Sequence, residues 1–161
     1  MSTLNIRNAV EADVEIIMSF IKALAEYEHL ESEVTATEEV ILESLFVKKA
    51  AEVLIAEYDE SPVGFALYFQ NFSTFTGKPG IYLEDLFVLK DYRNFKIGKA
   101  LLSRIAQIAI ERDCGRFEWA CLDWNEPSIK FYKHMGAVPM SDWTVYRITG
   151  ETLSNVAKGI L

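Results

Sequence analysis

YLEDLFVLKDYRNFKIGKALL, residues 82–102, is the stretch of this sequence that decides the fold. Its first part is apolar apart from two adjacent carboxylates, Glu84 and Asp85, and predicts a strand. Over residues 97–112 the apolar residues recur at helical spacing, so a helix is expected to begin soon after Arg93. A turn that opens a helix presents backbone N–H groups and the positive end of the helix dipole. Together they form a cradle that suits a pyrophosphate.

The turn before this helix is basic in an otherwise acidic chain. Arg93, Lys96 and Lys99 add positive charge, and Gly98 permits close approach of the backbone. As a bare pattern, one glycine in a basic turn fits an ordinary solvated helix cap about as well. The turn is therefore a candidate phosphate site that needs support from the rest of the chain.

Outward from this stretch, strands alternate with helices. Strands are expected at residues 4–8, 51–58, 63–70, 81–88, 116–122 and 143–148, and helices at 11–27, 37–46, 97–112 and 128–135, followed by a short helical tail. Gly64 is a candidate bulge in the hairpin. No repeat or linker divides the chain. The expected fold class is α/β in the α+β sense, an antiparallel meander followed by helix-connected strands, in a single domain over residues 1–161.

Composition narrows the class of partner. The chain has 161 residues, of which half are hydrophobic, enough for one well-buried core. Its 16 basic and 24 acidic residues give a net charge of −8, which argues against general binding of nucleic acid. A negative field favours a small cationic partner, although the same charge also serves solubility alone.

Compartment and metal chemistry follow from what the sequence lacks. No secretory signal and no run of roughly 20 apolar residues is present, so no membrane association is expected. Cys114 and Cys121 form no CxxC pair, and His29 and His134 lie far apart in the sequence. We therefore expect a cytoplasmic protein without a disulfide framework or a metal site, in which Cys121 is a buried structural residue of a strand.

The basic turn resembles the acetyl-CoA loop of the GNAT N-acetyltransferase superfamily, which has the pattern Gln/Arg-x-x-Gly-x-Gly/Ala between a strand and a helix. Arg93, Asn94, Phe95, Lys96, Ile97 and Gly98 occupy its positions. Lys96 replaces the first glycine, and a lysine is unfavourable wherever the backbone needs a positive φ. The resemblance implies binding of acetyl-CoA, and the replacement implies that this binding is weakened rather than absent.

The resemblance extends from about residue 6 to residue 148. The segments YLEDLFV, DYRNFKIG, KALAEYE at residues 22–28 and WNEPSIKFYKHMGA at 124–137 resemble the diamine acetyltransferase branch, which holds the spermidine/spermine and thialysine acetyltransferases. The resemblance implies the GNAT fold, a mixed and mostly antiparallel central sheet flanked by helices. It also implies a homodimer and direct attack of the amine on acetyl-CoA.

Two catalytic residues follow from the resemblance. Tyr132 is the candidate acid that protonates the departing thiolate of CoA, and Glu84 is the candidate base, acting through water. Taken alone, Tyr132 equally fits a tyrosine that packs its ring in the core. An exposed strand carboxylate would likewise explain Glu84. Neighbouring residues on a strand point to opposite faces, so Glu84 and Asp85 form an adjacent pair only if a bulge intervenes.

The remaining site residues also follow from the resemblance. The acceptor is expected at Tyr27, Glu28, Glu84, Asp85 and Asp142. The coenzyme is expected along Leu86, Phe87 and Val88 of the strand, along the loop from Arg93 to Lys99, and at Asn125 and Ser128.

The reaction expected from these residues is acetyl transfer to a primary amine of a small cationic acceptor, such as a diamine, a polyamine or a lysine-like amino acid. One alternative keeps the reaction but uses a protein amino terminus or an aminoglycoside as the acceptor. A second alternative is a catalytically weak acyl-CoA-binding or regulatory module, which the lysine at position 96 keeps open.

Overall fold

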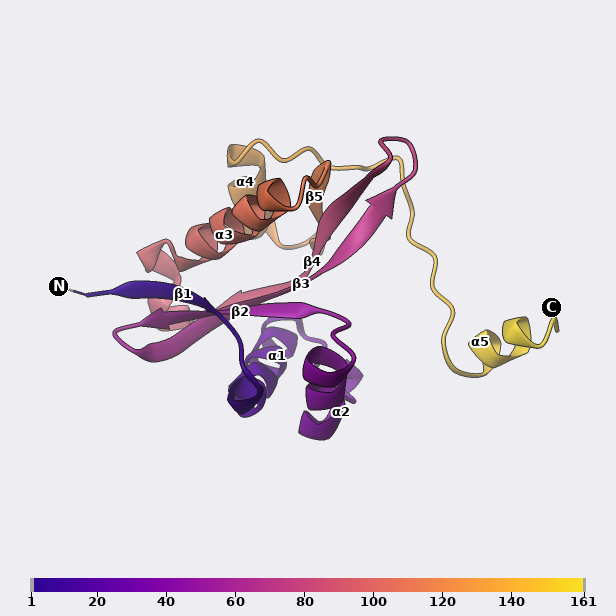
Figure 1. Ribbon diagram of the computed structural model, residues 1–161, viewed down its shortest axis with the longest axis horizontal. Helices are drawn as coiled ribbons and strands as arrows, with labels where there is room; N and C mark the ends of the chain where they lie inside the picture. Colours follow the sequence, from indigo (N-terminus) through magenta and orange to yellow (C-terminus); the bar gives the residue numbers. More distant parts are fainter. Residues whose placement is uncertain (1, 161) are drawn as a thin grey trace. The chain divides into compact units, whose positions relative to one another are not determined.

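A five-stranded sheet organises the first of the two units, Met1–Ala120 and Cys121–Leu161, into which the computed structural model divides. The structure describes residues 2–160, and each unit is described by itself. The strands are β1 (Leu4–Asn8), β2 (Glu52–Tyr58), β3 (Ser61–Ser73), β4 (Lys78–Val88) and β5 (Arg116–Trp119). They lie side by side in sequence order, antiparallel except for the parallel pair β4 and β5 (Figure 1). The mixed, mostly antiparallel sheet confirms the predicted fold class.

Helices cover both faces of this sheet. They are the 3-10 helices η1 (Glu11–Asp13), η2 (Glu31–Glu33) and η4 (Lys90–Phe95), the α-helices α1 (Val14–Glu28), α2 (Glu38–Leu42) and α3 (Ile97–Glu111), and the π-helix η3 (Glu43–Val47). In Figure 1, α1 and α2 lie on one face and α3 lies on the other. The prediction of a helix over residues 37–46 is confirmed, with Thr37 as its cap, although its second half is a π-helix.

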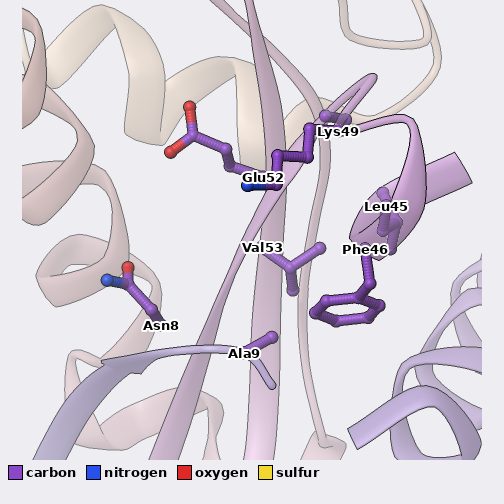
Figure 2. A pocket seen from close by; sticks show the side chains of 8 residues that line it. Asn8, Ala9, Leu45, Phe46, Lys49, Glu52 and Val53 are labelled. Carbon is purple, nitrogen blue, oxygen red and sulfur yellow. The ribbon is translucent and has the colours of Figure 1, made fainter. Parts of the chain in front are cut away.

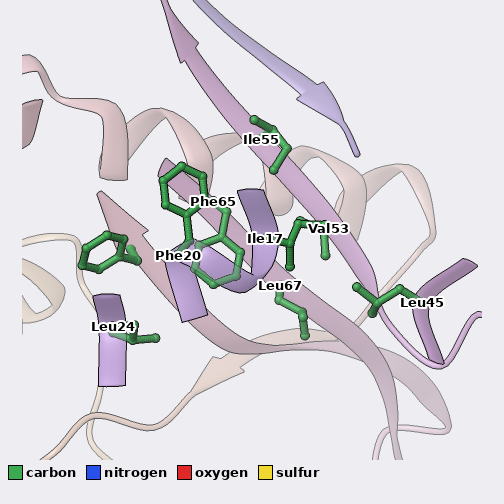
Figure 3. Close-up of a cluster of buried hydrophobic side chains, with 9 residues drawn as sticks. Ile17, Phe20, Leu24, Leu45, Val53, Ile55, Phe65 and Leu67 are labelled. Carbon is green, nitrogen blue, oxygen red and sulfur yellow. The ribbon is translucent and has the colours of Figure 1, made fainter. Parts of the chain in front are cut away.

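The core on the α1 face explains why α1 packs there. Its buried members are Ile17, Phe20, Leu24, Leu45, Val53, Ile55, Phe65, Leu67 and Phe87 (Figure 3). Ile17, Phe20 and Leu24 follow at spacings of three and four residues, which places them on one side of the helix. The ring of Phe20 stacks on that of Phe65 with centroids 5.6 Å apart. The alternating residues of β3, Ala66 and Tyr68, are buried as well, as expected for a strand that is covered on both faces.

Two bulges interrupt the pairing of β3 with its neighbours. Ala56 pairs with Gly64 and Glu57 pairs with Pro62, so the extra residue is Val63, one position before the glycine that the sequence suggests. A Cβ at Gly64 would lie 2.6 Å from the carbonyl oxygen of Phe87. Gly64 therefore allows β4 to approach closely rather than forming the bulge itself.

The second bulge lies in β4. Leu83 pairs with Tyr68 of β3, whereas Asp85 pairs with the next residue along β3, Leu67. Glu84 is therefore the extra residue, and the bulge required for Glu84 and Asp85 to act together is present.

The second unit contains two helices, α4 (Glu126–His134) and α5 (Gly150–Ala157). The strand predicted at residues 143–148 is wrong, because this segment has no regular secondary structure. Its alternation of side chains favours an extended chain, but a strand also needs a neighbouring strand to pair with. The predicted strand at 116–122 ends at Trp119, so Cys121 lies beyond it and is half-buried rather than buried. The single domain over residues 1–161 stays a prediction.

Candidate active site

The backbone of the basic turn contains a left-handed residue at the position where the sequence departs from the loop pattern. The helix η4 ends at Phe95, Lys96 adopts φ 60° and ψ 20°, and α3 begins at Ile97. A side chain in this conformation costs about 1–2 kcal/mol, which glycine avoids. The expectation that lysine is unfavourable here is therefore supported by the geometry of the turn.

The first turn of α3 presents its backbone to open space. A Cβ added at Gly98 would meet no atom within 4 Å, so no packing within the described residues requires a glycine there. No side chain caps this helix, and its first backbone bond is donated by Ala100 to the carbonyl of Lys96. The N–H groups of Ile97, Gly98 and Lys99 thus precede the helical ladder, and the side chains of Lys96 and Lys99 are exposed. These residues fit a pyrophosphate group.

Arg93 does not turn toward this cradle. Its guanidinium carbon lies 4.8 Å from the centre of the Tyr27 ring and 5.7 Å from that of Phe87. Its Nε donates a hydrogen bond to the carbonyl of Val88 at 3.0 Å. The arginine therefore links the loop to α1 and β4, a contact that no local sequence pattern reveals.

Residues 84–88 of β4 pair with β3 along one edge, but among the described residues they pair with no strand along the other edge. β4 pairs with β3 up to Val88, but with β5 only over Gly80–Leu83. Backbone groups of residues 84–88 on that edge are available to a ligand that binds as an added strand. Leu86 and Val88 are half-buried, whereas the Phe87 side chain belongs to the core, so Phe87 can contribute only its backbone.

Two carboxylates of the first unit, Glu28 and Glu84, act on a third, Asp85. Burial, together with the negative charges of Glu84 and Glu28, raises the pKa of Asp85 to about 6. Burial also raises the pKa of Glu28 at the end of α1. Glu84 itself is exposed, and its charge contributes to raising the pKa of Tyr82, after the larger effect of burial. The group brings together three predicted acceptor residues, and Asp85 has a pKa in the range that suits a general base.

The second unit holds the remaining predicted residues. The side chain of Asn125, only 6% exposed, accepts a hydrogen bond from the backbone N–H of Ser128 at 3.4 Å and caps α4, with Pro127 in its first turn. The predicted helix entrance is thereby confirmed. Tyr132 is half-buried, with its ring 5.6 Å from that of Phe131, and Asp142 is exposed in a turn. The roles of Tyr132 and Asp142 stay predictions.

A pocket of about 410 Å³ opens elsewhere in the first unit. Its lining comes from the end of β1, the start of β2 and helix η3, where Phe46 and Val53 supply apolar wall and Lys49 stands at one side (Figure 2). None of the predicted site residues lines it. The predicted site residues of the first unit therefore lie outside this pocket, in the loop, on β4 and at the end of α1.

Among residues 2–160, every helix is too short or too polar to cross a membrane. Within the same range, no three His, Cys, Asp or Glu side chains come together as metal ligands would.

Comparison with known proteins gives matches over most of the chain. Residues 17–137 match the model of the Acetyltransferase (GNAT) family. The chain is 34% identical to thialysine N-epsilon-acetyltransferase of Mus musculus, over 98% of this chain and 99% of that protein. Over 59% of the chain it is 41% identical to the L-ornithine N5-acetyltransferase NATA1 of Arabidopsis thaliana, of which 42% is covered. The solved structure of an integron cassette protein of V. cholerae superposes with a TM-score of 0.79 at 27% identity, covering 96% of this chain and 98% of that one.

Proposed function

Because the chain belongs to the GNAT family of acetyltransferases, it is an acetyl-CoA-dependent N-acetyltransferase of a small amine, and we propose that this amine is cationic: a diamine, a polyamine or a lysine-like amino acid such as thialysine. The observation that carries the proposal is the group of carboxylates Glu28, Glu84 and Asp85 in the same unit as the basic loop. Negative charge attracts a polycationic acceptor. The basic loop serves the phosphates of the coenzyme.

Acetyl-CoA, when bound, supplies an acetyl group activated as a thioester. The N–H groups at the start of α3 and the side chains of Lys96 and Lys99 would hold its phosphates. The edge of β4 at Leu86 and Val88 would hold its pantetheine arm. In the second unit, Asn125 and Ser128 are the residues that we propose for the coenzyme. This assignment gives a reason for the glycine at position 98. Packing within the described residues does not require a glycine there, whereas the close approach of a phosphate group would.

An amine reacts only after it loses a proton, so a base must stand near the acceptor. Asp85 is ionised above about pH 6 and suits this task, with Glu84 beside it in the bulge as the alternative that acts through water. The amine nitrogen then bonds to the acetyl carbon and the carbon–sulfur bond breaks. Tyr132 would give its proton to the leaving thiolate and would regain one when the newly acetylated nitrogen loses its second proton. No covalent enzyme intermediate is needed.

The rest of the acceptor is held by charge. Glu28 lies at the end of α1, where its carboxylate adds to the field at Asp85, and Asp142 is the matching carboxylate that we propose in the second unit. The ring of Tyr27 already carries the guanidinium of Arg93 on one side. We therefore expect the second cation of a diamine to bind carboxylates rather than that side of the ring.

The decisive experiment measures release of CoA thiol from acetyl-CoA over a panel of putrescine, spermidine, thialysine, ornithine, lysine, an aminoglycoside and a short peptide. Turnover is expected with the small amines, and the value of kcat/KM should fall below about pH 6 as the base gains a proton. The Tyr132→Phe variant should lose at least about tenfold in kcat, or about 1.4 kcal/mol, with acetyl-CoA binding unchanged.

Tyr146→Phe is the matched control for that variant, because Tyr146 is 92% exposed and lies in the same unit. Unchanged turnover in Tyr132→Phe would remove Tyr132 from the mechanism. Comparison of Glu84→Gln with Asp85→Asn identifies the base: only the variant that lacks it should lose the fall in rate at acid pH.

A weak acyl-CoA-binding module is the second candidate function, and the left-handed backbone at Lys96 is the observation that favours it. Tight binding of acetyl-CoA without turnover of any amine in the panel would support this candidate. Turnover of a small amine would exclude it.

We also propose that the enzyme is a cytoplasmic homodimer that does not bind nucleic acid. The net charge of −8 supports the last point, and the two cysteines of the sequence, Cys114 and Cys121, form no CxxC pair, which fits a reducing compartment. The dimer is supported by the large apolar side chains that the second unit exposes, among them Val138, Trp143 and Val145.

A further inference from the structure

Arg93 is an exposed arginine in a basic loop, yet its side chain lies on the protein. The guanidinium carbon is 4.8 Å from the centre of the Tyr27 ring, within the range of a cation–π contact. Its Nε donates to the Val88 carbonyl at 3.0 Å, and the Phe87 ring lies 5.7 Å away. Three elements thus meet at one side chain: η4, α1 and β4.

These contacts restrain the side chain from two directions. The hydrogen bond fixes one nitrogen of the guanidinium against the end of β4, and the planar group then lies over the Tyr27 ring. An arginine held in this way is occupied on the protein and is not extended toward the amides at the start of α3. The loop retains Lys96 and Lys99 as exposed cations for phosphate.

The residue that Arg93 holds lies next to an acceptor residue. Tyr27 and Glu28 form the end of α1, and the helix stops at His29 in a left-handed conformation. The charge of Glu28 acts on Asp85 of β4. Because Tyr27 and Glu28 are neighbours at the end of α1, holding the Tyr27 ring in place also restrains the Glu28 carboxylate.

We propose that Arg93 is a positioning residue for the acceptor site: by holding Tyr27 against β4 it fixes the end of α1 that carries Glu28, and it is not a ligand of the coenzyme phosphates. This inference rests on the proposed function, because it assigns the group around Glu28 and Asp85 to the acceptor.

The test compares Arg93→Met, Arg93→Lys, Tyr27→Leu and the double variant Arg93→Met with Tyr27→Leu. Arg93→Met is expected to raise the KM for spermidine or thialysine roughly two- to fivefold, the size of an exposed cation–π contact. The Kd for acetyl-CoA, from titration calorimetry, should stay within about twofold of the parent value. Arg93→Lys keeps a cation and should lie between Arg93→Met and the parent.

Arg104→Met is the matched control, because Arg104 is a half-buried arginine of α3 that pairs with Glu111 at 3.0 Å, and Glu111 is not a predicted site residue. It should leave both constants at the parent values. Urea unfolding of the four proteins in the Arg93 and Tyr27 cycle gives a second readout that needs no turnover. The double variant should lose less stability than the sum of the two single losses, because the shared contact is counted in both single variants, whereas the bond of Arg93 to Val88 is counted in one.

A large rise of the acetyl-CoA Kd in Arg93→Met, with the acceptor KM unchanged, would overturn the proposal and make Arg93 a phosphate ligand. Additive losses of stability in the cycle would also overturn it. Absence of turnover in the parent enzyme is a different result: it would sink the proposed acceptor, whereas the unfolding cycle and the acetyl-CoA titration would still decide what Arg93 contacts.

Discussion

Lys96 is a residue whose backbone conformation and side chain are poorly matched. Its φ of 60° is the left-handed conformation, and the side chain is exposed and makes no ion pair in the described part of the chain. We predict that Lys96→Gly stabilises the protein by about 0.5–1 kcal/mol. The relief of about 1–2 kcal/mol of strain exceeds the entropy that glycine loses on folding.

Urea unfolding at fixed pH checks this prediction. Lys99→Gly, in the first turn of the same helix, removes the same side chain from a helical position and should instead destabilise the protein by about 1 kcal/mol. Equal effects of the two changes would mean that the strain at Lys96 is not significant.

Asp85 should make stability depend on pH in an unusual direction. Its folded-state pKa of about 6 lies above the ordinary value of 3.8, so the folded state binds the extra proton between these values. The stability that this carboxyl contributes is therefore present below pH 4 and is lost as the pH rises through 6. Asp85→Asn should be the more stable protein at pH 7.5, by on the order of 1–3 kcal/mol, and the advantage should vanish near pH 4.

Asp13 provides the control of opposite sign. Its carboxylate accepts two hydrogen bonds from Arg7, at 2.7 and 2.8 Å, which hold its pKa below the usual value. Asp13→Asn should be less stable than the parent at neutral pH, and the difference should shrink as the pH falls through the lowered pKa. Unfolding free energies at pH 3, 4, 5.5 and 7.5 measure both variants, and the same sign for the two at pH 7.5 would contradict the assignment.

At the scale of the elements, two glycines separate packing from ligand binding. Gly64 faces the backbone of β4, where a Cβ would lie 2.6 Å from the Phe87 oxygen, so Gly64→Ala should cost about 1–3 kcal/mol. Gly98 faces open space at the start of α3. We predict that Gly98→Ala leaves the free energy of unfolding unchanged or raises it by up to about 1 kcal/mol. We also expect at least about a fivefold weaker affinity for acetyl-CoA, because the added methyl group occupies the phosphate approach.

Chemical unfolding and acetyl-CoA titration of the two alanine variants measure this contrast. Undiminished acetyl-CoA affinity in Gly98→Ala would place the phosphates away from the first turn of α3.

At the scale of the whole molecule, the proposed dimer predicts a solution mass of about 37 kDa, twice the 18.3 kDa of one chain. Val145, at 85% exposure, belongs to the apolar side chains that we propose for the partner. Val145→Asp should shift the enzyme toward the monomer without unfolding it, because exposed positions tolerate substitution. Light scattering coupled to size exclusion measures the mass.

Thr152→Asp adds the same charge at an exposed position of α5 and serves as the control. A parent chain that elutes as a monomer at micromolar concentration would refute the dimer.

Part of the acidic excess behind the net charge of −8 is gathered in the first unit. The sequence predicts that acidic residues meet a cationic acceptor, and Glu28, Glu84 and Asp85 come together from α1 and β4 as that prediction requires. Burial, with a further contribution from the charges of Glu84 and Glu28, raises the pKa of Asp85, whereas the basic residues Lys96 and Lys99 stand at the start of α3. Which of the acidic residues would serve as base depends on burial, and burial is not visible in the order of residues.

Local pattern by itself determined most of the elements of this protein. The helical spacing of apolar residues predicts α1 and α3, and Thr37 and Asn125 mark helix starts that the structure confirms. Such signals succeed because capping and amphipathic spacing act between residues a few positions apart. The resemblance of the loop located the left-handed position at Lys96 for the same reason.

Only the tertiary structure decided the features that depend on distant parts of the chain. The bulge at Glu84 arises from the register of β4 against Leu67 and Tyr68 of β3, and the contact of Arg93 with Tyr27 joins a loop to a helix far away in sequence. The segment 143–148 alternates as a strand does, but it has no strand to pair with among the described residues of its unit. Strand pairing and burial join residues far apart in the chain, so local pattern predicts the elements, whereas their packing sets the pKa of Asp85 and the place of Arg93.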